Sequence, residues 1–147
     1  MLVYLDTSAY VKLIIDEDGA DETRALVQRA RRAASSVVTY PEASAALCRR
    51  NREARSPAAR LASWVDALDV TWRHTIALPV VPRLAGELAV THGLRGMDAI
   101  QLSAAIALRE RAPSGALQAQ VVFAAFDRQL LEAAEREGFA TLGRPLE

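Results

Sequence analysis

The chain begins with an uninterrupted apolar run, Met1 to Leu5, which Asp6 ends. A run without alternating polar residues is typical of a strand that is covered on both faces, as in parallel sheets. A helical periodicity follows from Ala9 to Ile15. Ligands of open α/β sheets bind beyond the carboxyl ends of the strands, so Asp6 is predicted to lie where such a domain carries its chemistry.

The rest of the chain alternates short apolar runs with segments whose apolar residues are spaced by three and four. Further strands are predicted at residues 37–38, 75–78, 120–126 and 139–142. Further helices are predicted at residues 20–33, 39–52, 83–92, 98–109 and 128–137, with another after Pro57 and a loop at residues 113–115. This alternation predicts one three-layer α/β/α domain over residues 1–147, with a mainly parallel sheet.

Three more acids, Glu42, Asp98 and Asp127, stand at strand ends or helix starts like Asp6. Glu42 also has the capping-box spacing from Thr39, and the macrodipole favours an acid such as Asp98 in a first helical turn. Right-handed winding would nevertheless place the four acids on one rim of the sheet. Clustered carboxylates repel unless a cation lies among them, and an all-oxygen set suits Mg²⁺ or Mn²⁺. The pattern therefore predicts one metal site.

Composition limits the class of protein. The chain has 147 residues, 51% of them hydrophobic, which is enough for one core. It has no apolar stretch of membrane-spanning length and no charged leader, so we expect a cytoplasmic protein that does not contact membranes. The single cysteine, Cys48, is predicted to be a small buried thiol in a helix. His74 and His92 are expected to be surface or structural residues.

Charge is unevenly distributed, although the net charge is zero. The segment from Thr23 to Arg60 carries nine arginines and two acids, a net charge of about +7, and the remainder carries about −7. This asymmetry indicates an anionic partner. A solvated helix face, or the arginine bias of a GC-rich genome, would give the same pattern, so charge alone does not decide between them.

Four short motifs resemble the signatures of PIN-domain ribonucleases, and in particular of VapC-type toxins from toxin–antitoxin modules. They are Asp6-Thr7-Ser8 after the first apolar run, Glu42 in Tyr-Pro-Glu-Ala-Ser-Ala, Asp98 in Met-Asp-Ala-Ile-Gln-Leu and Asp127 in Ala-Phe-Asp-Arg-Gln-Leu. Together they span nearly the whole chain. The resemblance implies an endoribonuclease that depends on Mg²⁺ or Mn²⁺, is usually a homodimer and is inhibited by a VapB-type antitoxin.

The same resemblance implies that the four acids are the catalytic metal ligands and that Thr7 and Ser8 support them. One departure concerns Ala125, two residues before the last acid, where the family often has Ser or Thr. A haloacid-dehalogenase-type phosphatase would need an acid at Ser8, and a receiver domain would need a lysine near the last strand, whereas Lys12 is the only lysine. A PIN-like module that binds RNA or protein without catalysis remains as an alternative, and the intact acid quartet argues against it.

Overall fold

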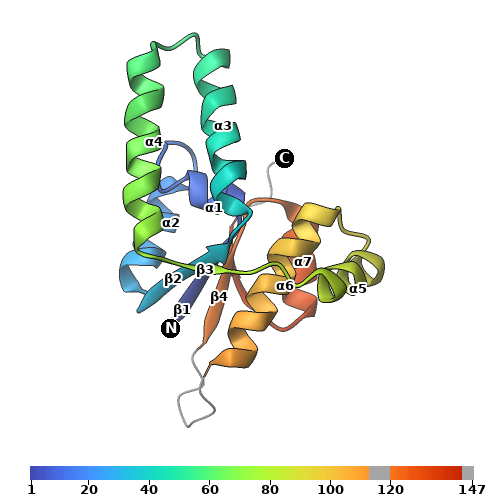
Figure 1. Cartoon of the computed structure of the whole chain (residues 1–147). Coiled ribbons are helices and arrows are strands. Elements are labelled where there is room, and N and C mark those ends of the chain that lie inside the picture. Colours follow the sequence, from blue (N-terminus) through green and yellow to red (C-terminus); the bar gives the residue numbers. More distant parts are fainter. Residues whose placement is uncertain (113–119, 144–147) are drawn as a thin grey trace.

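All strands of the sheet run parallel, in the order β3-β2-β1-β4-β5 (Figure 1). The computed structural model describes residues 1–112 and 120–143, so the predicted loop at 113–115 lies outside the described residues. The strands are β1 (Leu2–Leu5), β2 (Arg32–Ser36), β3 (Thr75–Leu78), β4 (Val121–Ala124) and β5 (Ala140–Leu142). The helices of the described residues are α1 (Thr7–Val11), α2 (Ala20–Arg29), α3 (Thr39–Glu53), α4 (Ala58–Arg73), α5 (Pro82–His92), α6 (Gly96–Arg111) and α7 (Arg128–Arg136).

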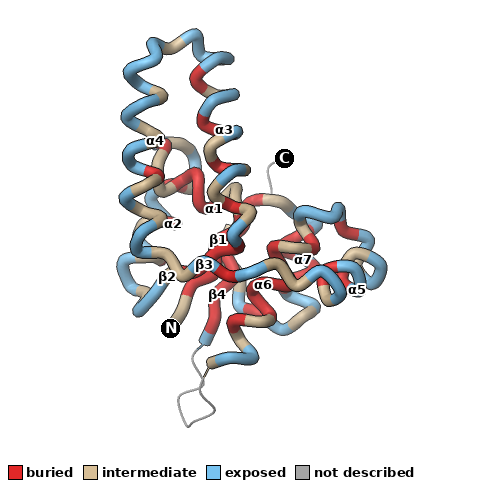
Figure 2. The backbone as a smooth tube through the Cα atoms, viewed as in Figure 1, coloured by how far each residue is buried: buried red, intermediate tan, exposed pale blue. Residues whose placement is uncertain are grey.

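The sheet separates two hydrophobic cores, which confirms the predicted three-layer α/β/α fold. Side chains alternate between the faces of a strand, so Val3 and Leu5 pack with α1 to α4, whereas Tyr4 packs with α5 to α7. Both faces of β1 are therefore buried, as its uninterrupted apolar run predicts (Figure 2). Within the described residues, no helix is both long and apolar enough to cross a membrane.

The winding of the chain reverses between β1 and β4. From β1 the chain proceeds outward to β2 and β3, then returns to β4 on the other side of β1 and ends at β5. The ends of the two central strands are paired, Leu5 with Ala124, and the Asp6 amide donates a hydrogen bond to the Ala124 carbonyl at 3.1 Å. Such a reversal opens a crevice at the carboxyl ends of the strands, where doubly wound domains bind their ligands.

The second strand lies at a different position from the one that the sequence predicts. The predicted strand at 37–38 is wrong, because β2 is formed by Arg32–Ser36 and Val37 is 43% exposed. The predicted helix at 20–33 likewise ends earlier, at Arg29. Ser35 and Ser36 are buried within the sheet, where the Ser35 hydroxyl donates to the Leu5 carbonyl at 2.6 Å. This hydrogen bond offsets the cost of burying the Ser35 hydroxyl in a strand whose small, polar residues have poor strand propensity.

Helices α3 and α4 form an antiparallel arm that extends beyond the sheet (Figure 1). Ala43 and Leu47 face the core, and one residue further along the helix Cys48 is turned by about 100° toward solvent. The prediction of a buried thiol is therefore wrong. On α4, Leu68 is fully buried but Trp64 is only half-buried, so the arm has little core of its own.

Candidate active site

Asp6 stands at the end of β1, at the point where the winding reverses. It is 5% exposed and is the N-cap of α1. Its Oδ1 accepts hydrogen bonds from the Ala9 amide at 2.9 Å and from the Ser8 hydroxyl at 2.7 Å. Ser8 also accepts a bond from the Phe126 amide at 2.9 Å, so it joins Asp6 to the segment that carries Asp127.

The pKa of Asp6 is raised to about 7, mainly because burial disfavours its charged form. The hydrogen bonds from Ala9 and Ser8 lower this pKa, whereas the negative charges of Asp98 and Glu42 raise it further. Three of the four predicted acids therefore lie close enough to interact electrostatically. The structure brings them together from three segments that are far apart in the sequence.

Glu42 lies in the first turn of α3 but does not cap that helix. The helix begins at Thr39, and no side chain caps its start. Instead, Glu42 Oε1 accepts hydrogen bonds from the Thr7 hydroxyl at 2.7 Å and from Gln101 Nε2 at 3.1 Å. The capping-box interpretation of Glu42 is wrong, and Thr7 supports Glu42 as Ser8 supports Asp6.

Asp98 and Asp127 share one cation, Arg95, which the sequence analysis did not single out. Arg95 Nε donates to Asp98 Oδ2 at 3.1 Å, and its Nη2 lies 3.9 Å from Asp127 Oδ2. The hydrogen bond to Asp98, followed by the charges of Asp98 and Asp127, raises the pKa of Arg95. No side chain caps the start of α6, whereas Asp127 caps α7 through the Leu130 amide at 2.9 Å. Arg95 thus links the last two acids.

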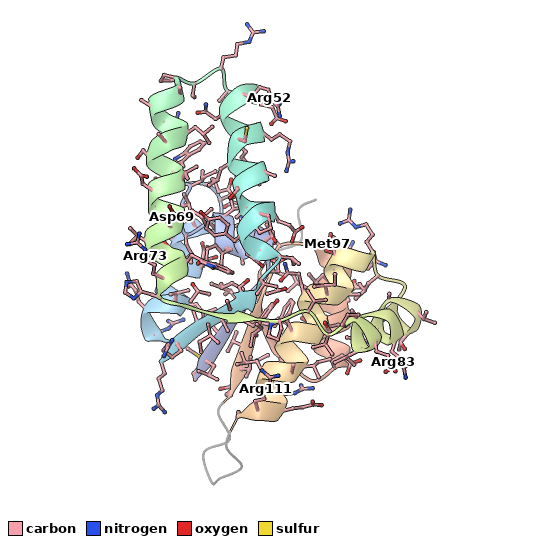
Figure 3. All side chains as sticks on the ribbon, viewed as in Figure 1. Arg52, Asp69, Arg73, Arg83, Met97 and Arg111 are labelled. Atoms are coloured by element: carbon pink, nitrogen blue, oxygen red, sulfur yellow. The ribbon has the colours of Figure 1, made fainter. Side chains whose placement is uncertain are left out.

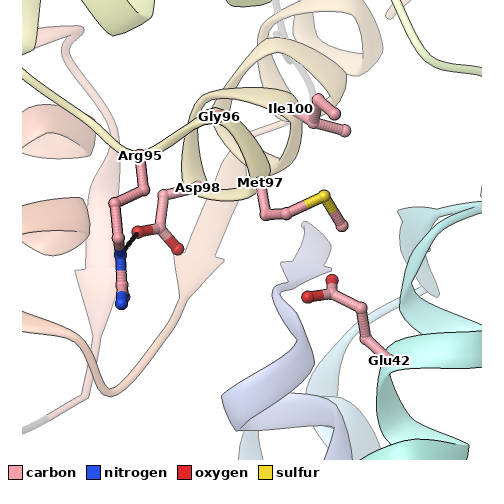
Figure 4. A pocket seen from close by; sticks show the side chains of 6 residues that line it. All are labelled: Glu42, Arg95, Gly96, Met97, Asp98 and Ile100. Carbon is pink, nitrogen blue, oxygen red and sulfur yellow. Dashed lines mark hydrogen bonds and ion pairs between the residues drawn. The ribbon is translucent and has the colours of Figure 1, made fainter.

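An open pocket of about 560 Å³ lies between α3 and α6 (Figure 4). Its lining consists of Glu42, Arg95, Gly96, Met97, Asp98 and Ile100. Glu42 projects from one side and Asp98 from the other, and Met97 extends between them (Figure 4). Ala125 does not contribute a group here, because it is fully buried in the core under α5 to α7.

The chemistry of the four acids fits a hard divalent cation. Their donors are all carboxylate oxygens, which Mg²⁺ and Mn²⁺ prefer. Within residues 1–112 and 120–143, however, no three His, Cys, Asp or Glu side chains are already arranged as a coordination shell. Arg95 occupies a position against two of the acids, and its exposed side chain is 78% accessible. A cation that binds all four acids would therefore have to displace Arg95.

The two histidines lie outside this group of acids. His92 Nε2 is 2.7 Å from Glu137 Oε1, a contact between α5 and the end of α7, and His74 is the exposed C-cap of α4. These positions agree with the expectation of surface or structural roles. The residues that sequence reasoning missed are Arg95 and Gln101, which stand three residues before and three residues after Asp98. That spacing places all three on one side of the helix start.

Fold and site together define a class: a doubly wound α/β domain with a cluster of acids where its winding reverses. The model of the PIN domain family matches residues 3–136. The chain therefore belongs to the PIN domain family, as its motifs predict.

The chain is also similar to two curated relatives and to two solved structures. Ribonuclease VapC45 and Ribonuclease VapC49, from two strains of Mycobacterium tuberculosis, are each 36% identical to it over 141 residues, or 93% of this chain and 92% of theirs. PAE2754 from Pyrobaculum aerophilum has a TM-score of 0.67 at 21% identity and covers 96% of this chain and 89% of its own. VapBC2 from Rickettsia felis, bound to a DNA fragment from its promoter, has a TM-score of 0.60 at 14% identity and covers 97% and 98%. The two structures support the fold alone.

Proposed function

We propose that the chain is a VapC-type endoribonuclease that depends on Mg²⁺ or Mn²⁺ and acts as the toxin of a toxin–antitoxin module. The observation that carries the proposal is that Asp6 interacts electrostatically with Glu42 and Asp98, and that Arg95 joins Asp98 to Asp127. Identity of 36% to two ribonucleases over nearly the whole chain supports the same activity. A fold that only binds a partner does not need a carboxylate whose pKa is raised by burial and, further, by two neighbouring acids.

The four acids would hold one or two divalent ions. A bound ion would supply Lewis-acid chemistry: it would lower the pKa of the water that serves as nucleophile and offset negative charge on the scissile phosphate. Asp6 would bind such an ion as a carboxylate, which the Ser8 and Ala9 donors hold in place. Thr7 holds Glu42 in the same way. With water as nucleophile, the products carry a 5′-phosphate and a 3′-hydroxyl.

Positive charge on the arm suits an RNA backbone. Arg49, Arg52, Arg55 and Arg60 are exposed at and near the end of the arm, where Arg52 points into solvent (Figure 3). Helix α3 leads from these arginines directly to Glu42 at its other end. Contacts with phosphates add affinity and fix orientation without reading sequence. The arm would thus guide RNA toward the acids.

The partner is a VapB-type antitoxin, and the chain itself forms a homodimer. The two ribonuclease relatives carry VapC names, and the Rickettsia felis structure with the same fold is a VapBC2 assembly. An open, acidic pocket is complementary to a basic side chain, and such a side chain would compete with the metal for Asp98 and Glu42. We expect expression of the chain alone to slow growth and co-expression of the antitoxin to restore it.

The test compares site variants with a matched surface variant. Asp6→Asn and Asp98→Asn should abolish Mn²⁺-dependent RNA cleavage while the circular dichroism spectrum stays that of wild type. Asp66→Asn removes an exposed acid from α4 and should leave cleavage unchanged. EDTA should stop the wild-type reaction. Undiminished cleavage by either site variant would refute the assignment, and RNA binding without any cleavage would favour the non-catalytic alternative.

A further inference from the structure

Gln101 is a buried polar residue with an unusual number of partners. It lies on α6, one turn after Asp98, and is 2% exposed. Its amide group contacts side chains from β1, α1 and α3, so it joins the helix that carries Asp98 to the segments that carry Asp6 and Glu42. The contacts are Tyr4 Oη to its Oε1 at 2.6 Å, and its Nε2 to Thr7 Oγ1 at 3.1 Å, to Thr39 Oγ1 at 3.0 Å and to Glu42 Oε1 at 3.1 Å.

The donors and acceptors around Gln101 can be assigned by starting from the hydrogen bonds of Tyr4. The Ser36 amide can only donate, and it donates to Tyr4 Oη at 3.1 Å. The hydrogen of the Tyr4 hydroxyl is therefore available to Gln101 Oε1, which can only accept. This assigns the other end of the amide, the Nε2 group, to the side of Glu42. The Tyr4 hydroxyl at one end and the Glu42 carboxylate at the other thus favour the same orientation of the Gln101 amide.

The amide in turn fixes one oxygen of Glu42. Oε1 receives both Gln101 Nε2 and the Thr7 hydroxyl, whereas no donor in the described part of the chain contacts Oε2. Glu42 also lines the pocket opposite Asp98. With Oε1 held by two donors, rotation of the carboxylate is restricted and Oε2 is left for a ligand in the pocket.

We propose that Gln101 is a positioning residue of the site, which holds Glu42 in the orientation that binds a divalent cation, with Tyr4 setting the orientation of its amide. The inference rests on the proposed function, because it assumes that Glu42 is a metal ligand. Residues that orient a ligand from behind typically change metal affinity by about 10- to 100-fold when they are removed.

The test measures Mn²⁺ affinity by isothermal titration calorimetry and needs no RNA. Gln101→Met keeps the length of the side chain and removes the amide, so the dissociation constant should rise about 10- to 100-fold. Gln129→Met is the matched control, since the exposed Gln129 donates only to the Gly93 carbonyl on the surface, and it should bind Mn²⁺ as wild type does. An unchanged affinity in Gln101→Met would overturn the inference.

A variant that already lacks the Glu42 carboxylate distinguishes a positioning role of Gln101 from a general effect of Gln101 on the stability of the fold. In Glu42→Ala, the added change Gln101→Met should alter Mn²⁺ affinity by less than about twofold, because an effect that acts through Glu42 cannot occur without it. The same 10- to 100-fold loss in both backgrounds would show that Gln101 only maintains the fold, and would overturn the inference.

Tyr4→Phe keeps the inference testable if Gln101→Met does not fold. The phenyl ring retains the packing of Tyr4 on Phe123, whose ring centroid lies 5.3 Å away, but it no longer selects one end of the amide. Mn²⁺ affinity should fall severalfold in Tyr4→Phe and should not fall further when Glu42→Ala is already present. Wild-type affinity in Tyr4→Phe would contradict the inference. A wild type that binds no Mn²⁺ would overturn the proposed function as well.

Discussion

Arg95 donates to Asp98 at 3.1 Å, so one of the acids proposed to bind metal is paired with a cation of the chain itself. The same guanidinium lies 3.9 Å from Asp127. Arg95 offsets the repulsion among acids that gather at one rim. Its high exposure allows the side chain to leave without disturbing the core. The site therefore has a cation of its own that a metal ion would replace.

Arg95→Gln removes this cation and should change stability in opposite directions with and without metal. In EDTA the variant should melt below wild type, because Asp98 and Asp127 lose their partner. With Mn²⁺ its melting temperature should rise more than that of wild type, because no cation competes for the acids. Thermal melts of both proteins across a Mn²⁺ titration provide the measurement.

Arg24→Gln is the control for this comparison, because Arg24 pairs with Asp16 at 3.1 Å on the opposite helical layer. It should respond to Mn²⁺ as wild type does. Equal responses of Arg95→Gln and Arg24→Gln would mean that Arg95 does not compete with metal.

The raised pKa of Asp6 predicts how metal-free stability depends on pH. The folded-state pKa is about 7, above the ordinary value of 3.8, so the folded chain binds more protons than the unfolded chain between these values. Stability contributed by the protonated carboxyl is present below about pH 4 and is lost as pH rises toward 7. In EDTA, Asp6→Asn should show a flatter decline over this window than wild type, as measured by urea unfolding at each pH.

The Mn²⁺ complex provides a second check on Asp6. Since a ligand carboxylate must be deprotonated, binding of Mn²⁺ to wild type at pH 6 should release a proton, seen as a binding enthalpy that depends on the buffer. If the stability of the metal-free protein depends on pH in the same way for wild type and Asp6→Asn, the pKa of Asp6 is not raised in the folded chain.

The sequence predicted the positions of Asp6 and Asp127 in the fold better than it predicted the second strand. Asp6 and Asp127 follow strongly apolar strands, so their positions at the ends of β1 and β4 come directly from local pattern. The strand β2, Arg32–Ser36, has no such pattern, because small and polar residues are stabilised there by two neighbouring strands and by hydrogen bonds to Leu5 and Tyr4. Those partners are distant in sequence, and a local window does not contain them.

The same reason explains why Gln101 was missed. A polar residue on an otherwise apolar helix was visible in the sequence, three residues after Asp98. Its partners, however, come from three other elements, and their meeting depends on how α3 and α6 pack against β1. The interpretation of Glu42 as a helix cap failed for the same reason, since the spacing from Thr39 was right but a tertiary contact with Thr7 took its place.

The backbone at Gly143 lies so close to the backbone at Ala125 that adding a side chain at Gly143 should be strongly unfavourable. Gly143 has a φ of 146°, and a Cβ added there would lie 1.6 Å from the Ala125 carbonyl oxygen. Gly143→Ala should therefore lower the melting temperature by at least about 3 °C, because the backbone before Asp127 must move. Gly86→Ala adds a Cβ with no atom within 4 Å, in the middle of α5, and should stabilise the protein by about 0.5–1 kcal/mol. Thermal melts compare the two, and a neutral Gly143→Ala would contradict the close approach.

The arginines of the arm predict how RNA affinity depends on salt. The double variant Arg49→Gln/Arg52→Gln removes two exposed charges from α3, and each lost phosphate contact lowers the slope of log affinity against log salt by about 0.7. We therefore expect the slope to fall by about 1.4, and affinity to weaken alike for unrelated single strands. The measurement is RNA binding at several salt concentrations in the Asp98→Asn background, which prevents cleavage.

Arg83→Gln/Arg111→Gln makes the same change in net charge on α5 and α6, away from the arm (Figure 3). If RNA follows the arm, this control keeps the wild-type slope, because long-range charge effects between exposed groups are screened beyond about 8–10 Å at physiological salt. Equal losses in the two double variants would mean that RNA responds only to net charge, and the arm would then have no special role in binding.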